Sequence, residues 1–148
     1  MTDETIRMLQ LAQQGFHCSQ ILLSMGLEAQ SKSNLDLIRA MEGLAGGLGF
    51  SGDVCGSLTG GACLLGLYAG RGAPDEEEDD RLNLMINELV EWFSDEYGKK
   101  FGGIRCDAIL GDDPAGKTTR CPAIVIGVYE KVKGLLSENG YNLSEGRE

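Results

Sequence analysis

VCGSLTGGACLLGLYAG, residues 54–70, is the stretch of sequence that decides the fold of this chain. Its residues are apolar or small on every side, which is typical of a helix buried on all sides. The stretch is short for a membrane span, which takes about 20 apolar residues, and it has neither a basic flank nor an aromatic belt. We therefore predict a glycine-rich core helix over residues 54–70 and no insertion into a membrane.

Apolar residues recur at helical spacing on both sides of this core helix. An acidic run, residues 74–80, is expected to form the first turns of one of these helices, because Asp and Glu favour the positive end of the helix dipole. No run of alternating apolar and polar residues stands out as a strand. The sequence predicts an all-α bundle of about six to seven helices. Besides the core helix, they cover about residues 5–14, 18–25, 34–44, 74–97, 104–110 and 122–136.

Length and composition favour one globular domain. The chain has 148 residues, about what a single hydrophobic core serves. Its apolar fraction of 42% is slightly low because 22 glycines dilute it, so disorder does not explain the composition. We expect a single domain over residues 1–148, with a frayed tail at 140–148.

The net charge disfavours binding to nucleic acid or to an anionic membrane, and the N-terminal sequence disfavours secretion. Asp and Glu number 23 against 13 Lys and Arg, and the net charge of -10 repels nucleic-acid phosphates and anionic membrane surfaces. The first residues, MTDETIRMLQ, are acidic and polar and do not resemble a secretion signal. We expect a cytoplasmic protein that does not bind nucleic acid.

Five cysteines remain to be explained. A reducing cytosol disfavours a disulfide framework, so ligation or redox chemistry is the better interpretation. A helix N-terminus lowers the pKa of a thiol there and so favours the thiolate. Cys63, in the middle of the core helix, is expected to be a packing residue. The other four lie at or beside predicted helix starts: Cys18 after Gly15, Cys55 after Asp53, Cys106 after Gly103 and Cys121 before Pro122.

The cysteine pattern resembles that of a known family. The matching pieces are FHCSQ at 16–20, the glycine-rich loop from Gly46, VCGSLTGG at 54–61, Cys106 and Cys121. Together they resemble the redox-active proteins named for the pattern C, GCAxxG, C, C, over nearly the whole chain. Ser57 stands where the family usually has alanine, and Cys63 has no counterpart.

This resemblance implies a redox-active protein, and related domains suggest an iron-sulfur cluster, of 2Fe-2S or 4Fe-4S type. The ligands would be Cys18, Cys55, Cys106 and Cys121. Gly56, Gly60 and Gly61 would leave room for the cluster and expose N–H groups to it. The activity would be electron transfer with a redox partner protein that the sequence does not identify, and a homodimer is compatible with it.

Two alternatives stay open at the level of sequence. A cysteine pair could cycle between dithiol and disulfide. The chain could instead be a non-catalytic helical interaction module, either metal-free or stabilised by zinc. The spacings between the four cysteines, 37, 51 and 15 residues, match neither zinc knuckles nor common ferredoxin patterns.

Three further features carry less weight. Residues 111–118, GDDPAGKT, satisfy the P-loop pattern, but two aspartates would lie beside the phosphates and the preceding segment is a poor strand. Residues 47–52 satisfy GxGxxG, but they follow a predicted helix where a dinucleotide fold needs a strand. His17, beside Cys18, is expected to be a surface residue, with a ligand or base role as the alternative.

Overall fold

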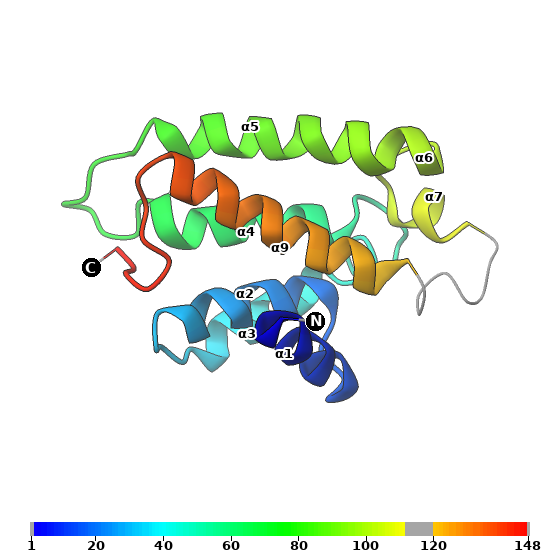
Figure 1. Cartoon of the computed structure of the whole chain (residues 1–148), viewed down its shortest axis with the longest axis horizontal. Helices are drawn as coiled ribbons and strands as arrows, with labels where there is room; N and C mark the ends of the chain where they lie inside the picture. The colour runs from blue at the N-terminus through cyan, green and yellow to red at the C-terminus, as the bar shows by residue number, and fades with distance from the viewer. Residues whose placement is uncertain (1, 112–119, 148) are drawn as a thin grey trace.

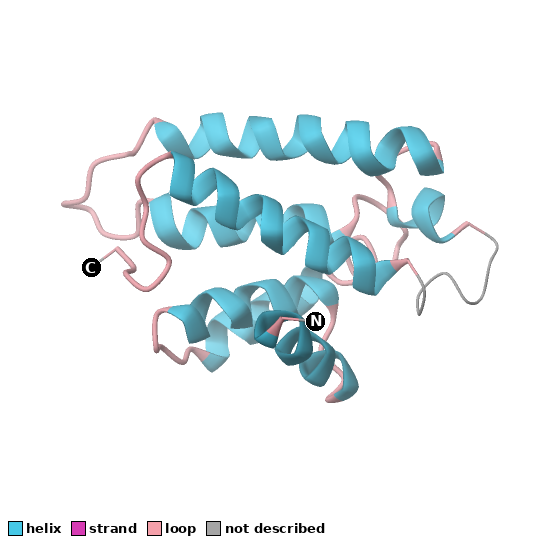
Figure 2. Cartoon of the chain, viewed as in Figure 1, coloured by secondary structure: helices cyan, strands magenta, loops and turns pink. Residues whose placement is uncertain are grey.

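The helix predicted from the glycine-rich stretch is α4, Gly56–Ala69, and it packs against three others. These are α2 (Cys18–Ala29), α5 (Arg81–Phe93) and α9 (Cys121–Glu138). This arrangement comes from a computed structural model that describes residues 2–111 and 120–147 (Figure 1). Over those residues the fold is all-α and contains no strand, as predicted (Figure 2).

The remaining helices surround this centre. In Figure 1, α1 to α3 lie on one side of α4 and α9, and α5 lies on the other. If the contiguous α5, η2 and α6 are taken as one helix, the described part of the chain forms seven helices in one domain. The other elements are α1 (Asp3–Gln13), α3 (Leu35–Met41), η1 (Glu42–Leu44), η2 (Ser94–Gly98), α6 (Lys99–Phe101) and α7 (Cys106–Leu110).

Glycines on α4 allow the neighbouring helices to approach closely. A Cβ atom added at Gly60 would lie 2.9 Å from the Cα atom of Ser19 on α2. A Cβ atom at Gly61 would lie 2.7 Å from a methyl group of Val128 on α9. Both distances are shorter than van der Waals contact, so larger residues would force the helices apart. No helix within residues 2–111 and 120–147 is long and apolar enough to cross a membrane.

The acidic run at 74–80 does not start a helix, so that prediction was wrong. Glu76 accepts hydrogen bonds from the backbone N–H groups of Gly72 and Ala73. Asp79 accepts from the backbone and the guanidinium of Arg81. These carboxylates hold a loop of residues 71–80 by local bonds that compete with helix formation. Helix α5 therefore begins only at Arg81.

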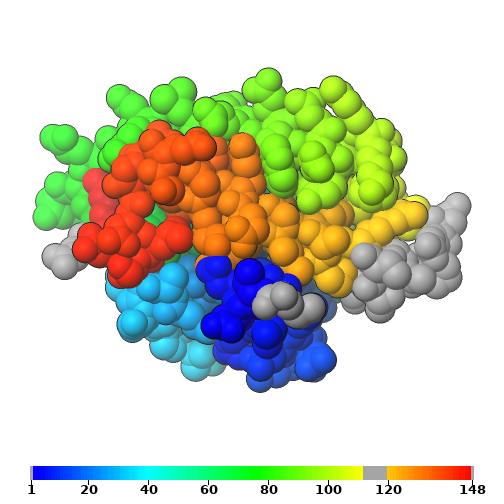
Figure 3. Space-filling view, in the orientation of Figure 1, coloured from blue at the N-terminus to red at the C-terminus, as the bar shows by residue number. Residues whose placement is uncertain are grey.

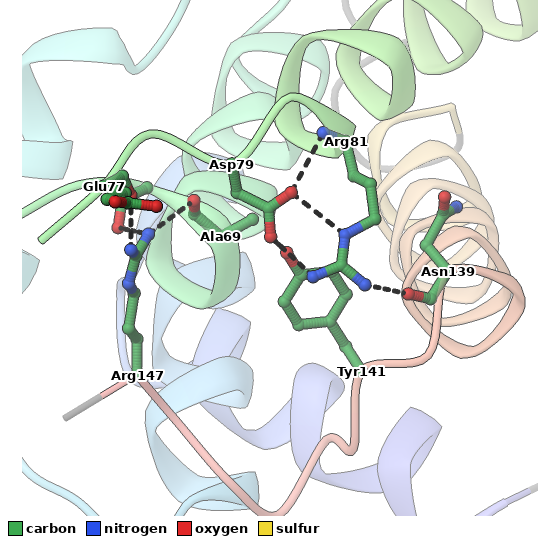
Figure 4. A network of polar contacts seen from close by, with 8 residues as sticks. Ala69, Glu77, Asp79, Arg81, Asn139, Tyr141 and Arg147 are labelled. Carbon is green, nitrogen blue, oxygen red and sulfur yellow. Dashed lines mark hydrogen bonds and ion pairs between the residues drawn. The ribbon is translucent and has the colours of Figure 1, made fainter.

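The segment after Gly140 lies against this loop and the end of α4, where the sequence predicted a frayed tail. Tyr141 donates a hydrogen bond to Asp79, and Arg147 donates to the carbonyl oxygens of Ala69 and Glu77 (Figure 4). In the space-filling view the red C-terminal segment lies beside the green loop and the blue N-terminal helices (Figure 3). Long-range hydrogen bonds thus hold residues 141–147.

Candidate functional site

Four of the five cysteines line one cavity of about 590 Å³. They are Cys18, Cys55, Cys106 and Cys121, which the sequence analysis grouped together. Cys63 does not line this cavity, and its side chain is exposed. The prediction that Cys63 is a packing residue was therefore wrong, because the helices that pack on α4 cover its other sides.

All four cavity cysteines lie at helix N-termini, as predicted. Cys18, Cys106 and Cys121 are the first residues of α2, α7 and α9, and Cys55 is the N-cap residue of α4. The unpaired N–H groups of a helix start carry a partial positive charge. The longer helices α2, α4 and α9 therefore direct positive potential towards this cavity.

A short antiparallel pairing between two distant segments places Cys55 and Cys106. The N–H group of Cys55 donates to the carbonyl oxygen of Ile104 at 2.9 Å, and the N–H group of Cys106 donates to that of Asp53 at 2.6 Å. Val54 and Arg105 form a single β-bridge between these bonds. Residues 53–55 and 104–106 therefore hold the starts of α4 and α7 side by side. Neither segment carries a sequence signal for this pairing.

Two other contacts place Cys121 and Cys18. The guanidinium of Arg120 donates to the carbonyl oxygen of Ile109 at 2.6 Å and so fastens the start of α9 to the end of α7. At the start of α2, the N–H group of His17 donates to the side chain of Gln20, whose amide donates to α3. His17 is half-buried and lines the cavity, where the sequence predicted a surface residue.

The loop that precedes Cys55 forms one edge of the cavity. Five consecutive residues, 46–50, have left-handed backbone conformations, and two of them are not glycine: Leu48 at φ 65° and Phe50 at φ 62°. Such conformations are costly for residues that carry a Cβ atom. The Phe50 ring packs edge-on against His17, with ring centroids 5.2 Å apart. The GxGxxG match at 47–52 therefore lies in an irregular loop that no strand precedes.

Burial raises the pKa of the Cys18 thiol to about 12, and the nearby Cys55 thiol adds to this rise. Burial also raises the pKa of Cys55, although the backbone N–H groups of Ser57 and Leu58 act in the opposite direction. The expectation of a lowered pKa at these helix starts was wrong for both thiols, because desolvation outweighs the dipole.

Ser57 acts on both of these thiols and was not singled out as a site residue from the sequence. Its side chain is 1% exposed, and its hydroxyl group acts to lower the pKa of both Cys18 and Cys55, against the effect of burial. A hydroxyl group can act as both donor and acceptor, so one serine can serve two thiols. The departure from the family's usual alanine at this position was the signal that could have identified it.

The three glycines predicted to surround a cofactor differ in their surroundings. Gly56 lines the cavity, and a Cβ atom there would lie 2.9 Å from the sulfur of Cys18. Gly60 and Gly61 are not among the residues that line it, since they face α2 and α9. Of these three glycines, Gly56 is therefore the one that lies against a cavity cysteine.

The cysteine side chains share the cavity without forming a ready ligand set. Within residues 2–111 and 120–147, no group of three or more His, Cys, Asp or Glu side chains is placed to hold a metal ion. The P-loop match at 111–118 lies, apart from Gly111, outside the described residues.

The sequence model of a family described as "Putative redox-active protein (C_GCAxxG_C_C)" matches residues 16–135. The chain belongs to this family. The C_GCAxxG_C_C match begins just before Cys18 and extends beyond Cys121, so it includes every cysteine of the cavity. No curated protein and no solved structure matches the chain.

Proposed function

We propose that this protein transfers electrons through an iron-sulfur cluster held by Cys18, Cys55, Cys106 and Cys121. The observation that carries the proposal is that four separate helices bring these thiols to one cavity. Four cysteine thiolates are the usual ligand set of two-iron and four-iron clusters. Membership of a redox-active family supports the same chemistry.

The surroundings of the thiols fit such a centre in the kind and number of donors. The helices α2, α4 and α9 begin at three of the cysteines, and their N-termini stabilise the negative charge of thiolate ligands. A bound metal displaces the proton of a coordinating thiol, so a raised pKa in the metal-free protein does not oppose ligation. Closure of the four side chains onto the centre would have to accompany its binding, because the thiols do not form a ready ligand set.

The chain's own groups would determine how the centre behaves. A bound cluster supplies a site that accepts and returns single electrons. The Ser57 hydroxyl group acts on the thiols of both Cys18 and Cys55, and hydrogen bonds from such a group to ligand sulfurs would tune the reduction potential. The pairing of 53–55 with 104–106 fixes the starts of α4 and α7, which orients two of the ligands.

A thiol-disulfide oxidoreductase is the second candidate, because Cys18 and Cys55 line one cavity and lie near enough for Cys55 to raise the pKa of Cys18. This reaction needs a thiolate as the attacking group. Burial raises the pKa of both Cys18 and Cys55, which disfavours the thiolate of either at neutral pH. We therefore place electron transfer through a metal centre first.

The decisive experiment is anaerobic purification followed by absorption spectroscopy and analysis of iron and sulfide. We expect visible charge-transfer absorption, with iron and sulfide in matching amounts. Each of the variants Cys18→Ser, Cys55→Ser, Cys106→Ser and Cys121→Ser should lose most of the bound iron. Cys63→Ser is the matched control and should keep it, because Cys63 is exposed and lies outside the cavity.

Three outcomes would overturn the proposal. A colourless protein that stays iron-free after anaerobic reconstitution would exclude the cluster. Zinc in the native protein, without redox activity, would support the structural interaction module. A defined Cys18–Cys55 bridge, found by mass spectrometry after mild oxidation of iron-free protein, would support the thiol-disulfide reaction.

The proposed compartment and partner of the protein are inferred from its sequence. We propose a cytoplasmic protein that exchanges electrons with a partner protein. The net charge of -10 favours a partner with a basic surface, because opposite charges speed association.

A further inference from the structure

The cavity extends beyond what a metal centre at the cysteines would occupy. Metal-sulfur bonds are about 2.3 Å long, so a metal centre stays next to the sulfur atoms that hold it. The cavity of about 590 Å³ falls within the range of pockets that bind whole small molecules, about 300–1,000 Å³. A second wall of the same cavity is therefore available to another molecule.

This second wall, which we call the apolar wall, comes from α1 and α9. Leu9 and Ile126 on it are only half-buried, so they present apolar surface to the cavity. Ligand pockets are typically concave and lined mostly by apolar side chains, as this wall is. The wall consists of Met8, Leu9, Ala12, Ile124, Val125 and Ile126.

The positive ends of α2, α4 and α9 lie at the cysteines, where they stabilise thiolate ligands. The side chains along the rest of the cavity favour an uncharged occupant. No lysine or arginine is among the described residues that line it. Asp107 is its carboxylate, and this group is already paired with Arg105 at 3.2 Å. Among the described lining residues, an anion such as a nucleotide would meet no lysine or arginine and would face Asp107.

An aromatic side chain at the edge of the cavity indicates the shape of the occupant. Phe50 lines the cavity and is 59% exposed, although its left-handed backbone conformation is costly. Strained residues concentrate at functional sites, where the surrounding structure holds them in place. An exposed ring in this position can pack against a flat ring of a ligand.

We propose that the apolar wall and Phe50 bind an uncharged aromatic molecule of one or two rings, the class to which quinones and hydroquinones belong. The molecule would lie beside the cysteines, where a hydroquinone would become the quinone by giving two electrons, one at a time, to the centre proposed above and two protons to water, while the centre passes each electron to the partner protein. Its redox role rests on that proposed function, whereas its binding can be measured independently.

Two ligands with the same ring system test the choice of an uncharged molecule. The probes are 1-naphthol, which is neutral at pH 7, and naphthalene-1-sulfonate, which is an anion. Calorimetric titration of the anaerobic full-length protein should show binding of 1-naphthol at a single site, with the sulfonate at least tenfold weaker. Absence of 1-naphthol binding by folded protein, or equal binding of the two probes, would overturn the proposal.

Variants in the loop at 46–50 test the location. Phe50→Ala should weaken 1-naphthol binding at least fivefold. Leu48→Ala is the matched control, because Leu48 belongs to the same left-handed turn and is 48% exposed but does not line the cavity. It should change the affinity less than twofold. An equal loss in both variants would show that the loop, and not the ring at the cavity, matters.

A second pair of variants tests the apolar wall itself. Ala12→Trp should fill the cavity from α1 and reduce 1-naphthol binding at least tenfold. Gln13→Trp adds the same side chain at an exposed neighbouring position outside the cavity and should leave binding unchanged. Unaltered binding by Ala12→Trp would contradict the proposed position of the ligand.

Iron analysis of the same samples separates this inference from the proposed function. Phe50→Ala leaves the four cysteines intact and adds no bulk to the cavity, so it should keep the iron content of the unmodified protein. A protein that holds iron but does not bind 1-naphthol would overturn this inference alone. A protein that binds 1-naphthol but holds no iron would overturn the cluster alone.

Discussion

Cys18 and Cys63 differ in the properties that decide how fast a thiol reacts. Cys63 is exposed, whereas Cys18 lies in the cavity and burial raises its pKa to about 12. Since alkylation requires an accessible thiolate, we predict that iodoacetamide at pH 8 modifies Cys63 at least tenfold faster than Cys18 in folded, metal-free protein. Peptide mass spectrometry over a time course measures both rates.

The unfolded protein provides the control for this prediction. In denaturant both thiols are solvated, so their rates should become similar. If Cys18 reacts as fast as Cys63 in the folded protein, the thiol is more accessible or more acidic than its burial implies. The thiol-disulfide candidate would then gain support.

The positions of the cavity cysteines were predictable from neighbouring residues, but their chemistry was not. Gly15 and Pro122 are local signals of a helix end and a helix start, and they correctly placed Cys18 and Cys121 at N-termini. Asp53 was predicted to cap the core helix, but the N-cap residue of α4 is Cys55 itself. The pKa depends on desolvation by residues that are distant in the chain, such as the α1 and α9 side chains of the cavity. A local signal contains no information about that burial.

Two glycines of helix α4 should respond in opposite ways to the same substitution. At Gly60 an added methyl group would meet the Ser19 backbone at 2.9 Å, and backbone atoms cannot move without a shift of α2. At Gly66 nothing lies within 4 Å. We predict that Gly60→Ala lowers the free energy of unfolding by about 1–3 kcal/mol. Gly66→Ala should raise it by about 0.5–1 kcal/mol, because alanine favours a helix interior.

Urea unfolding followed by circular dichroism measures both changes. Each variant is the control for the other, since both add one methyl group to the same helix. A gain in stability for Gly60→Ala would mean that α2 and α4 are further apart than the structure shows.

At the scale of elements, an unbroken run of apolar and small residues predicted the core helix to within two residues of its observed ends, 56 and 69. The sequence placed the start of α5 at residue 74, because acidic residues favour a helix start. In the structure these side chains instead form hydrogen bonds that hold a loop, and α5 begins at Arg81. Asp79 and Glu76 form hydrogen bonds with Arg81 and with the backbone of Gly72 and Ala73. The bonds are local, but their geometry depends on a loop that the C-terminal segment holds in place.

Asp79 connects three parts of the whole molecule: the loop at 71–80, the start of α5 and the C-terminal segment. Hydrogen bonds from the Arg81 guanidinium, and then from Tyr141, hold the pKa of this carboxyl well below its usual range. A lowered folded-state pKa gives stability that is present above the unfolded-state pKa of about 4. That stability is lost as the pH falls through the folded-state pKa.

We therefore predict that Asp79→Asn lowers the thermal unfolding midpoint at pH 7, and that its difference from the unmodified protein shrinks as the pH falls below about 4. Thermal scans from pH 7 to pH 2 measure this difference. Asp75→Asn, at an exposed position of the same loop, is the control and should leave the midpoint nearly unchanged. A constant difference at every pH would show that the Asp79 charge is not the cause.

A ribosome makes the chain from its N-terminus, so the four cavity cysteines emerge one after another. The walls of the cavity come from residues near 18, 55, 106 and 121, so they span most of the chain. A nascent chain that ends before Cys121 lacks both the fourth thiol and the α9 side of the apolar wall. Any occupant of the cavity is therefore acquired late, after α9 has emerged and packed against α4.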